Sequence, residues 1–408
     1  MNALDYLFWL SVALVGYTYV GYAAVVGLLA ALLAQWRKPA PRQPYEPEVT
    51  LVVPAYNEAN ILAVKVENCL AQDYPAAKLQ LLVITDGSTD NSAQVLAAYP
   101  RVLHLHAPAR GGKSLAENRA MEFVNTPYVV FTDANTLLNK QAVRELLQHY
   151  QDPKVGAVSG EKKVRVLAGS TPGAGEGLYW KYESFLKRCD SRVYSLMGAA
   201  GELVSFRSHL FRPLEADTIL DDFVQSLRIV EQGYTVVYEP AAYATEDPSA
   251  SLTDEWERKI RICAGGWQAM SRLRGLLRPW RQPLVTFLYV SHRVLRWSLA
   301  PVALALLLPL GTLLAATASG WMAGFYGLAV AAQLLFYWAA WRAWQGASSK
   351  LCVVPMYFCM MNLAVFAGFW RYHKKAQPAA WAKAARPPAQ AQLGHGAQVA
   401  SGQARIRD

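Results

Sequence analysis

The stretch that decides the fold is VTLVVP at residues 49–54, which is followed by a helical segment at 58–71 and by LQLLVIT at 79–85. The alternation continues with a predicted helix at 92–98, a strand at 101–106, a helix at 114–124 and the strand YVVFT at 128–132. Strands that are largely apolar and are separated by helices are typical of a parallel sheet covered on both faces. In such α/β sheets, ligands bind beyond the carboxyl ends of the strands.

Polar side chains follow three of these strands. Glu58 comes shortly after the first strand, Asp86 and Asp90 follow the second, and Asp133 and Asn135 follow the strand at 128–132. Because the carboxyl ends of parallel strands meet at one edge, we expect these side chains to converge there. For Asp86 and Asp90 the alternative is turn formation and helix capping, because DGSTD resembles a capping sequence.

Composition limits the class of protein. Of the 408 residues, 53% are hydrophobic and 17% are charged, against about 25% charged residues in soluble domains. This argues against disorder and against a purely soluble enzyme. The net charge of +10 suits an anionic partner such as a nucleotide, a nucleic acid or a lipid surface. The five cysteines include no CxxC pair, so neither a disulfide framework nor a zinc site is predicted.

Long uncharged runs flank the α/β region. Residues 6–34 contain no charge and exceed the roughly 20 residues that one membrane crossing needs, so we predict an uncleaved N-terminal anchor. Residues 297–341 are long enough for two spans, with a turn at Ser319 and Gly320. A third run at 351–370 contains Pro355 and Asn362, and a re-entrant segment is the alternative to a span there.

These patterns divide the chain into five parts. We predict an anchor at 1–36, an α/β domain at 37–278, an interfacial amphipathic helix at 279–296, two or three spans at 297–370 and a disordered basic tail at 371–408. Basic residues flank both ends of the domain, so the positive-inside rule predicts a cytoplasmic domain on the plasma (inner) membrane. Four crossings would put the tail outside, which conflicts with the basic residues that follow residue 370.

Four motifs in succession carry a resemblance. VVPAYNE at 52–58, ITDGSTDNS at 84–92, RGGKSLAENRA at 110–120 and FTDANT at 131–136 resemble the donor-site motifs of family 2 glycosyltransferases, including bacterial polysaccharide synthases. The resemblance covers roughly residues 5–370. It implies the GT-A fold, a Rossmann-like domain with a mostly parallel sheet, here with flanking transmembrane helices, and it implies no nucleic-acid partner.

The resemblance also implies roles at the donor side. Lys113 would face the diphosphate, since GGK at 111–113 lacks the spacing of an ATPase P-loop. Asp133 and Asn135 stand in place of a DxD motif and would bind Mg²⁺ or Mn²⁺. The neutral Asn135 departs from the motif, so the metal would rest mainly on Asp133, and metal-independent transfer stays open. The nucleobase and uridine contacts would come from Pro54, Ala55, Tyr56, Glu58 and Asp86.

The implied acceptor side begins with MGAAGELVSFR at 197–207, which includes Gly201, Phe206 and Arg207. In TILDDF at 218–223, Asp222 would be the general base, and Asp221 would raise its pKa as a neighbouring like charge. Helix capping by Asp221 is the alternative. Thr245–Glu246–Asp247 matches a TED triplet, but it follows the next strand, so we expect loop residues there.

The last motif lies at the place of a QxxRW signature. Arg258 and Arg261 would lie on the phosphate side, whereas Ile262 replaces the tryptophan that stacks on the acceptor. We expect Trp267 to serve in packing. The function implied is inverting transfer of a sugar from a nucleotide sugar, most simply UDP-linked, to a saccharide acceptor in polysaccharide synthesis. Transfer of one sugar to a membrane-lipid acceptor is one alternative, and a catalytically decayed membrane scaffold is another.

Overall fold

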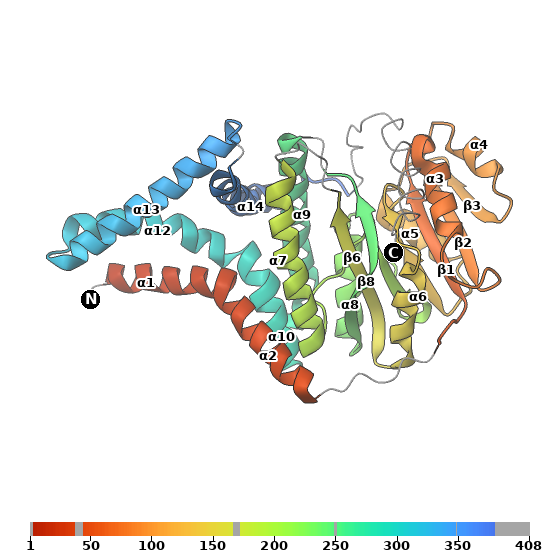
Figure 1. The fold of residues 1–408 in the computed structure, drawn as a ribbon, viewed down its shortest axis with the longest axis horizontal. Helices are drawn as coiled ribbons and strands as arrows, with labels where there is room; N and C mark the ends of the chain where they lie inside the picture. The colour runs from red at the N-terminus through yellow and green to blue at the C-terminus, as the bar shows by residue number, and fades with distance from the viewer. Residues whose placement is uncertain (1–2, 37–43, 166–171, 249–250, 348, 380–408) are drawn as a thin grey trace, which may run out of the picture.

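The strands form one mixed sheet. The computed structural model describes residues 3–36, 44–165, 172–248, 251–347 and 349–379. The strand order is β3-β2-β1-β4-β7-β6-β8-β5, in which β1, β2, β3 and β4 are parallel and β7 runs antiparallel to both neighbours. The predicted alternation of strands and helices is confirmed (Figure 1). The strands are β1 (Val49–Ala55), β2 (Leu79–Asp86), β3 (Val102–Ala107), β4 (Tyr128–Phe131), β5 (Leu137–Leu138), β6 (Val155–Val164), β7 (Val204–Arg207) and β8 (Thr235–Glu246).

Helices cover both faces of this sheet, as the apolar strands require. Side chains alternate along β1, so Val52 enters one hydrophobic cluster while Leu51 and Val53 enter another, and all three are buried. The domain helices are α3 (Ala59–Leu70), α4 (Ser92–Ala97), α5 (Lys113–Met121), α6 (Ala142–Leu147), α7 (Pro172–Val193), α8 (Asp221–Glu231) and α9 (Leu252–Arg272), with short 3₁₀ turns at Gln148–Gln151, Ser208–Leu210 and Arg274–Leu277.

Among the described residues, four helical segments are long and apolar enough to cross a membrane. The first comprises α1 (Ala3–Gly16), a π-helical turn at Tyr17–Gly21 and α2 (Tyr22–Trp36), and it bends near the π turn (Figure 1). The others are α12 (Leu299–Thr317), α13 (Trp321–Trp344) and α14 (Lys350–His373). The predicted turn between α12 and α13 is confirmed, and Gly320 has the positive φ of 62° that favours glycine.

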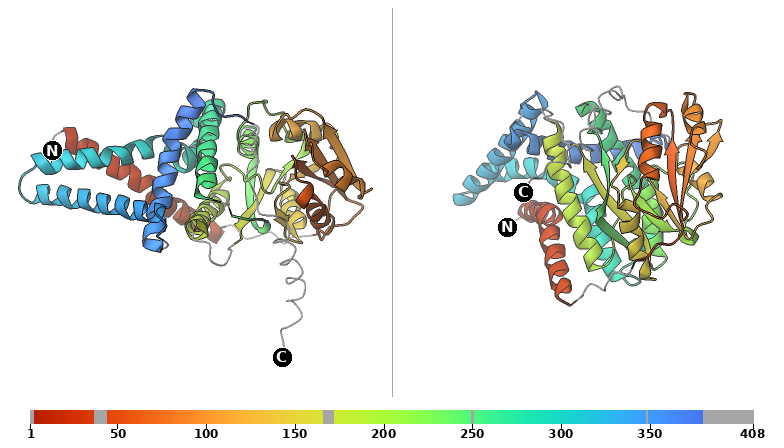
Figure 2. Two further views of the ribbon diagram at one scale, coloured as in Figure 1. Left: turned by 90° about the horizontal axis from the view of Figure 1, so that it is seen from above. Right: turned by 45° about the vertical axis from the view of Figure 1, so that its right-hand side comes forward.

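These helices form two groups. Helices α1, α12 and α13 lie side by side and project away from the domain, whereas α14 runs across them next to α9 (Figures 1 and 2). Arg371 lies 2.7 Å from Glu257 of α9, and Tyr372 Oη lies 2.9 Å from Ser271 Oγ. The basic end of α14 is therefore held against the α/β domain, which gives a physical reason for the cations after residue 370.

The segment predicted as an interfacial helix is helical over most of its length. It comprises α10 (Pro283–Tyr289), a π-helical turn at Val290–Val294 and α11 (Leu295–Trp297). One face, with Leu288 and His292, is buried against the domain, whereas Trp280 before the helix is 78% exposed. The prediction of a disordered tail from residue 371 is wrong for its first residues, because α14 continues to His373, and the tail lies outside the described residues from residue 380 onward.

Candidate active site

Asp86 organises the loop that precedes α5. It is the last residue of β2, is only 4% exposed, and accepts hydrogen bonds from Gly111 N at 3.0 Å and Gly112 N at 2.7 Å. The Arg119 guanidinium lies 2.6 Å from the same carboxylate. Gly112 adopts φ 90°, which lets the chain turn into α5 with both amides facing Asp86. The carboxylate thus fixes the loop that ends in Lys113.

The residues after β1 form the adjoining wall. Pro54 and Ala55 end the strand, Glu58 is buried, and the guanidinium of Arg110 lies 3.7 Å from the centre of the Tyr56 ring. Asp90 accepts from Ala59 N at 2.9 Å, which is the first amide of α3. Asp90 Oδ1 also accepts from Ser92 N, the first residue of α4, at 3.1 Å, and this bond supports the turn and capping interpretation for Asp90. The structure brings the predicted donor residues of β1 and β2 to one edge of the sheet.

Lys113 joins the donor side to the predicted base. Its ammonium lies 2.7 Å from Asp133 Oδ1 and 3.2 Å from Asp221 Oδ2, while Glu117 is 3.9 Å away on the next turn of α5. Burial alone would lower the pKa of Lys113, but Asp133 and Asp221 outweigh it and raise that pKa well above its usual value. Glu117 was not identified from the sequence, although its spacing of four residues from Lys113 is a usable signal.

Asp222 lies in the first turn of α8 beside the loop at 197–203, which contains Gly201 and is predicted to bind the acceptor. A Cβ atom added to Gly201 would lie 3.2 Å from Asp222 Oδ2 and 3.0 Å from Lys113 Nζ, so Gly201 lets this loop approach both side chains. Burial, and then the neighbouring Asp221, raise the pKa of Asp222 to about 7. Gly198 has φ +99°, and a Cβ there would come within 2.2 Å of the Phe223 ring.

The side chains around Asp133 fit a divalent cation only if the substrate supplies further oxygens. Among the described residues, no group of three or more His, Cys, Asp or Glu side chains could hold a metal. Asp133 offers one carboxylate, and the Asn135 amide donates to Glu246 Oε1 at 3.1 Å. Mg²⁺ commonly binds through one or two carboxylates plus substrate phosphates, so Asp133 with a diphosphate matches this pattern.

A cluster of charged side chains connects β6 and β8 to the loop after β4. The sequence did not identify its three members, Lys162, Glu202 and Glu246, as partners. Lys162 is buried and forms ion pairs with both Glu202 and Glu246. Although burial opposes the effect, Lys162 lowers the pKa of Glu202 to about 2. The expectation that Glu246 is a loop residue is wrong, because Glu246 ends β8 and contacts Asn135.

Lys65 of α3 supports the loop from the opposite side. It is completely buried, and its ammonium donates to Thr132 Oγ1 and to the Thr136 carbonyl, each at 2.8 Å. These contacts bracket Asp133 and fix the FTDANT turn. The sequence offered no signal for this role, because Lys65 lies in a helix that reads as an ordinary amphipathic element.

Helix α9 places only part of the last motif near the site. Burial lowers the pKa of Arg261 to about 10, while Asp221, Asp133 and Asp222 act against this shift, so Arg261 is electrostatically coupled to the site. Arg258 instead pairs with Glu255 at 2.8 Å. The expected packing role of Trp267 is confirmed by its contact with Phe369 of α14, with ring centroids 4.9 Å apart.

Phe206 and Arg207 are not brought to this edge. Strand β7 runs antiparallel to β4, so Val204 pairs with Phe131 near the site while Arg207 pairs with Tyr128 at the far end. Arg207 Nε donates to the Val155 carbonyl at 2.8 Å. Phe206 is buried in the core. Their predicted acceptor-side role gains no support from this position.

The helical segment 283–297 contacts the loop at 197–203 through Arg293. Its Nε donates to the Met197 carbonyl at 2.7 Å, and its Nη1 lies 2.7 Å from Glu183 of α7. Glu183 also pairs with Arg296 at 3.1 Å, and these cations, despite burial, hold its pKa well below the usual range. A buried ion network therefore links the loop before Gly201 to the helices that border the membrane segments.

Comparison with known proteins places this geometry in a family. The profile of Glycosyl transferase family 2 matches residues 50–198, and that of Glycosyl transferase family group 2 matches residues 128–370, more than half of the chain. The chain therefore belongs to the family 2 glycosyltransferases, as predicted. In the part of the chain that the structure describes, the α/β domain is joined to four helices suited to membrane crossing.

Relatives and a solved structure agree with this assignment. The chain is 26% identical over 235 residues to poly-β-1,6-N-acetyl-D-glucosamine synthase of Staphylococcus aureus, and 23% identical over the same length to that of Staphylococcus epidermidis. In both comparisons the match covers 55% of this chain and 56% of the relative, so the chain spans about half the length of these relatives.

The fold matches that of a mannosyltransferase from Pyrobaculum calidifontis, solved in complex with GDP-Man and Mn²⁺. The TM-score is 0.66 at 22% sequence identity, over 90% of this chain and 99% of that one. The predicted fold class, a GT-A domain with flanking membrane helices, is confirmed.

Proposed function

We propose that the protein transfers a sugar from a UDP-linked donor to a saccharide acceptor at the membrane, with inversion, as a step of polysaccharide synthesis. The observation that carries the proposal is the convergence of Asp133, Lys113 and Asp222 at the sheet edge that Asp86 organises. The synthase relatives support the polysaccharide product. Buried ion pairs add little to stability, so a structural role does not explain this cluster and a catalytic role is favoured over a decayed scaffold.

The donor would lie along the ends of β1, β2 and β4. Tyr56, backed by Arg110, would contact the nucleobase, while Glu58 and Asp86 would face the uridine. Lys113 and Arg261 would offset the charge of the diphosphate. A divalent cation, Mg²⁺ or Mn²⁺, would be held by Asp133 and would supply Lewis-acid stabilisation of the departing nucleoside diphosphate.

The acceptor would enter beside Gly201, whose lack of a side chain leaves room next to the carboxylate of Asp222 and the ammonium of Lys113. Asp222 takes the proton of the acceptor hydroxyl, and that oxygen attacks the anomeric carbon. The bond from this carbon to the donor diphosphate breaks, and its electron pair leaves with the diphosphate. A single displacement of this kind inverts the configuration. The pKa near 7 suits a base that must be both ionised and able to accept a proton.

We infer that α1, α12 and α13 cross the inner membrane and that α14 lies along its domain-side surface. Helix α14 runs across the other three (Figure 2) and contacts α9 through Tyr357 and Tyr372. This arrangement returns the chain to the domain side after α13. The basic residues after 370 then lie on the same, cytoplasmic side as the domain, which satisfies the positive-inside rule.

Transfer of one sugar to a lipid acceptor is the second candidate function. Ile262 packs against the hydrophobic core, and Trp267 packs against Phe369. Neither residue offers an aromatic surface on which a growing sugar chain could stack. This favours an acceptor that is held by the membrane.

The test is a donor screen with purified full-length protein in detergent, with Mg²⁺ or Mn²⁺ present. UDP-linked and GDP-linked sugars are compared by release of the nucleoside diphosphate, and the product anomer is determined by NMR. We expect release from a UDP sugar and an inverted product. Release only from GDP sugars would refute the donor assignment, and retention would refute the single displacement. A ladder of long chains supports the polysaccharide, whereas a single glycolipid supports the second candidate.

A further inference from the structure

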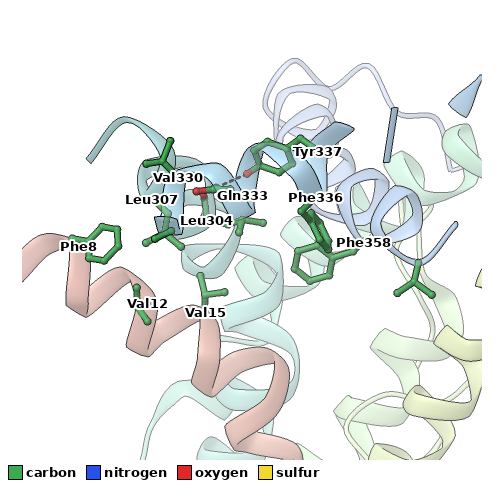
Figure 3. A pocket seen from close by; sticks show the side chains of 12 residues that line it. Phe8, Val12, Val15, Leu304, Leu307, Val330, Gln333, Phe336, Tyr337 and Phe358 are labelled. Carbon is green, nitrogen blue, oxygen red and sulfur yellow. Dashed lines mark hydrogen bonds between the residues drawn. The ribbon is translucent and has the colours of Figure 1, made fainter. Parts of the chain in front are cut away.

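An apolar groove lies among the membrane helices, away from the candidate active site. It has a volume of about 490 Å³ and opens sideways between α1, α12 and α13, with α14 at one end (Figure 3). This volume is within the range of about 300–1,000 Å³ that is usual for ligand pockets. Its lining residues are Phe8, Val12, Val15, Leu304, Leu307, Ala329, Val330, Gln333, Phe336, Tyr337, Val354 and Phe358.

The lining excludes a sugar chain. None of its residues is charged, and its polar side chains are Gln333 and Tyr337. These two bond to each other, since Gln333 Nε2 donates to Tyr337 Oη at 2.7 Å (Figure 3). A saccharide placed here would lose the hydrogen bonds that it makes with water and would gain few in return. The groove is therefore unsuited to conduct a polysaccharide product.

The side chains around the groove indicate which kind of ligand fills it. The outer faces of the same helices carry exposed apolar side chains, including Leu306 of α12 and Leu328 and Leu335 of α13, which is the surface expected to meet lipid tails. The groove is open and not an enclosed cavity, so a lipid tail can enter it from among the helices. Its residues on α12, Leu304 and Leu307, lie between the end of α12 next to the domain and the middle of the helix, and Val354 and Phe358 of α14 line one end of the groove. It therefore lies toward the domain-side leaflet.

We propose that this groove binds the acyl chain of a phospholipid from the domain-side leaflet. The chain fills apolar space between α1 and the α12–α13 hairpin and packs against the rings of Phe336 and Phe358. The bound lipid thereby adds to the contacts between α1 and α13, which include the ring pairs Phe8–Tyr326 and Trp9–Phe325. The proposal does not depend on which sugar or acceptor the enzyme uses.

The test uses full-length protein in nanodiscs of phosphatidylethanolamine and phosphatidylglycerol. They contain a trace of phosphatidylethanolamine with a photoreactive diazirine at mid-chain. After irradiation, cross-linked peptides are identified by mass spectrometry. We expect groove residues such as Val12, Leu307 and Val330 to be labelled. Val330→Trp fills the groove and is expected to lower labelling at Val12 and Leu307 about tenfold, a change equivalent to ~1.4 kcal/mol.

Leu335→Trp is the matched control, because it adds the same side chain to the outer face of the same helix, where Leu335 is 63% exposed. This variant is expected to keep groove labelling. Leu307→Ala enlarges the groove and is expected to retain labelling at Val12. Equal labelling at Val12 and Leu307 in Val330→Trp and the wild type would overturn the proposal. So would labelling confined to outward residues such as Leu335.

Discussion

The α/β domain has a donor half, from β1 to the loop after β4, and an acceptor half, from β6 to α9, named for the roles proposed above. The two halves hold their carboxylates in different ways. In the donor half, Asp86 binds the amides of Gly111 and Gly112 in addition to the Arg119 side chain, and Asp90 binds the amide of Ala59. In the acceptor half, carboxylates bind side-chain cations from distant elements, as in the ion pairs of Glu202 and Glu246 with Lys162. A contact with a backbone amide forms once the loop adopts its conformation. A buried ion pair forms only when two separate helices, strands or loops pack against each other.

This difference suggests a division of labour. Amide contacts would keep the proposed nucleotide pocket rigid, because they persist as long as the loops hold their conformation. The ion pairs of the acceptor half are worth much only while both partners stay buried and paired. We therefore expect substitutions in the acceptor half to affect stability or turnover more strongly than comparable substitutions in the donor half.

The largest expected effect is at Asp222, where the two halves meet. Asp222→Asn keeps the size of the side chain but removes the base, so kcat should fall by about 10²–10⁴-fold while donor affinity changes little. Steady-state kinetics and calorimetric donor binding measure the two quantities. Asp221→Asn is the matched control and should retain more activity, since the base remains. Equal losses in both variants would assign the charge pair, rather than one base, to catalysis.

The second prediction addresses the ion pairs directly. Lys162→Met leaves the carboxylates of Glu202 and Glu246 without their shared cation, and breaking a buried pair costs about 3–5 kcal/mol. Partial exposure of both glutamates should keep the loss near the lower value. Thermal unfolding in detergent should show a clearly lower Tm. Lys163→Met is the control, because Lys163 is exposed and contacts the Tyr243 ring, and it should change stability by less than about 1 kcal/mol.

The same difference explains which features could be predicted from the sequence. Apolar strand patterns identified β1, β2 and β4, and their positions at the strand ends identified Asp86 and Asp133, because loops after parallel strands share one edge. Lys113 was identified only from the resemblance of its motif to those of the family. Lys65 and Lys162 gave no such signal, since their contacts depend on how helices and strands pack in three dimensions. The sequence located the motif at 197–207 but could not show which of its residues lie near the site.

The antiparallel direction of β7 is the reason for that limit. It carries Arg207 three residues from Val204 toward the far end of the sheet, about 10 Å at the usual strand rise. In the same way, a hydropathy pattern could show that residues 351–370 are apolar. It could not show that α14 lies across the other helices, because that placement depends on contacts such as Arg371 with Glu257.

The third prediction concerns pH. Burial and Asp221 raise the pKa of Asp222 to about 7, and the base works only when it is ionised. The rate should therefore rise about tenfold per pH unit below 7 and level off above it. Asp221→Asn should move the midpoint of the kcat/KM profile to lower pH, because a neighbouring negative charge is removed. An unchanged midpoint in this variant would mean that another group limits the rate.

The sign for stability is opposite to the sign for activity. The folded protein binds the Asp222 proton more tightly than the unfolded chain does, so this group contributes stability at low pH. That contribution is lost as the pH rises from about 4, the usual pKa of aspartate, through about 7. Asp222→Asn should therefore flatten the dependence of Tm on pH in this window, which a series of thermal unfolding measurements would show.

The smallest expected effect is in the donor half. Asp90→Ala removes the acceptor for the first amide of α3 and for Ser92 N, and the loss of such a cap costs about 1 kcal/mol. Asp73→Ala, which removes an exposed ion pair with Arg144, should cost less than that. The Tm shifts should thus rank Lys162→Met first, Asp90→Ala second and Asp73→Ala last. If Asp90→Ala were as damaging as Lys162→Met, the contrast between local amide contacts and long-range ion pairs would not describe this domain, because a locally satisfied carboxylate would then carry as much stability as a buried ion pair.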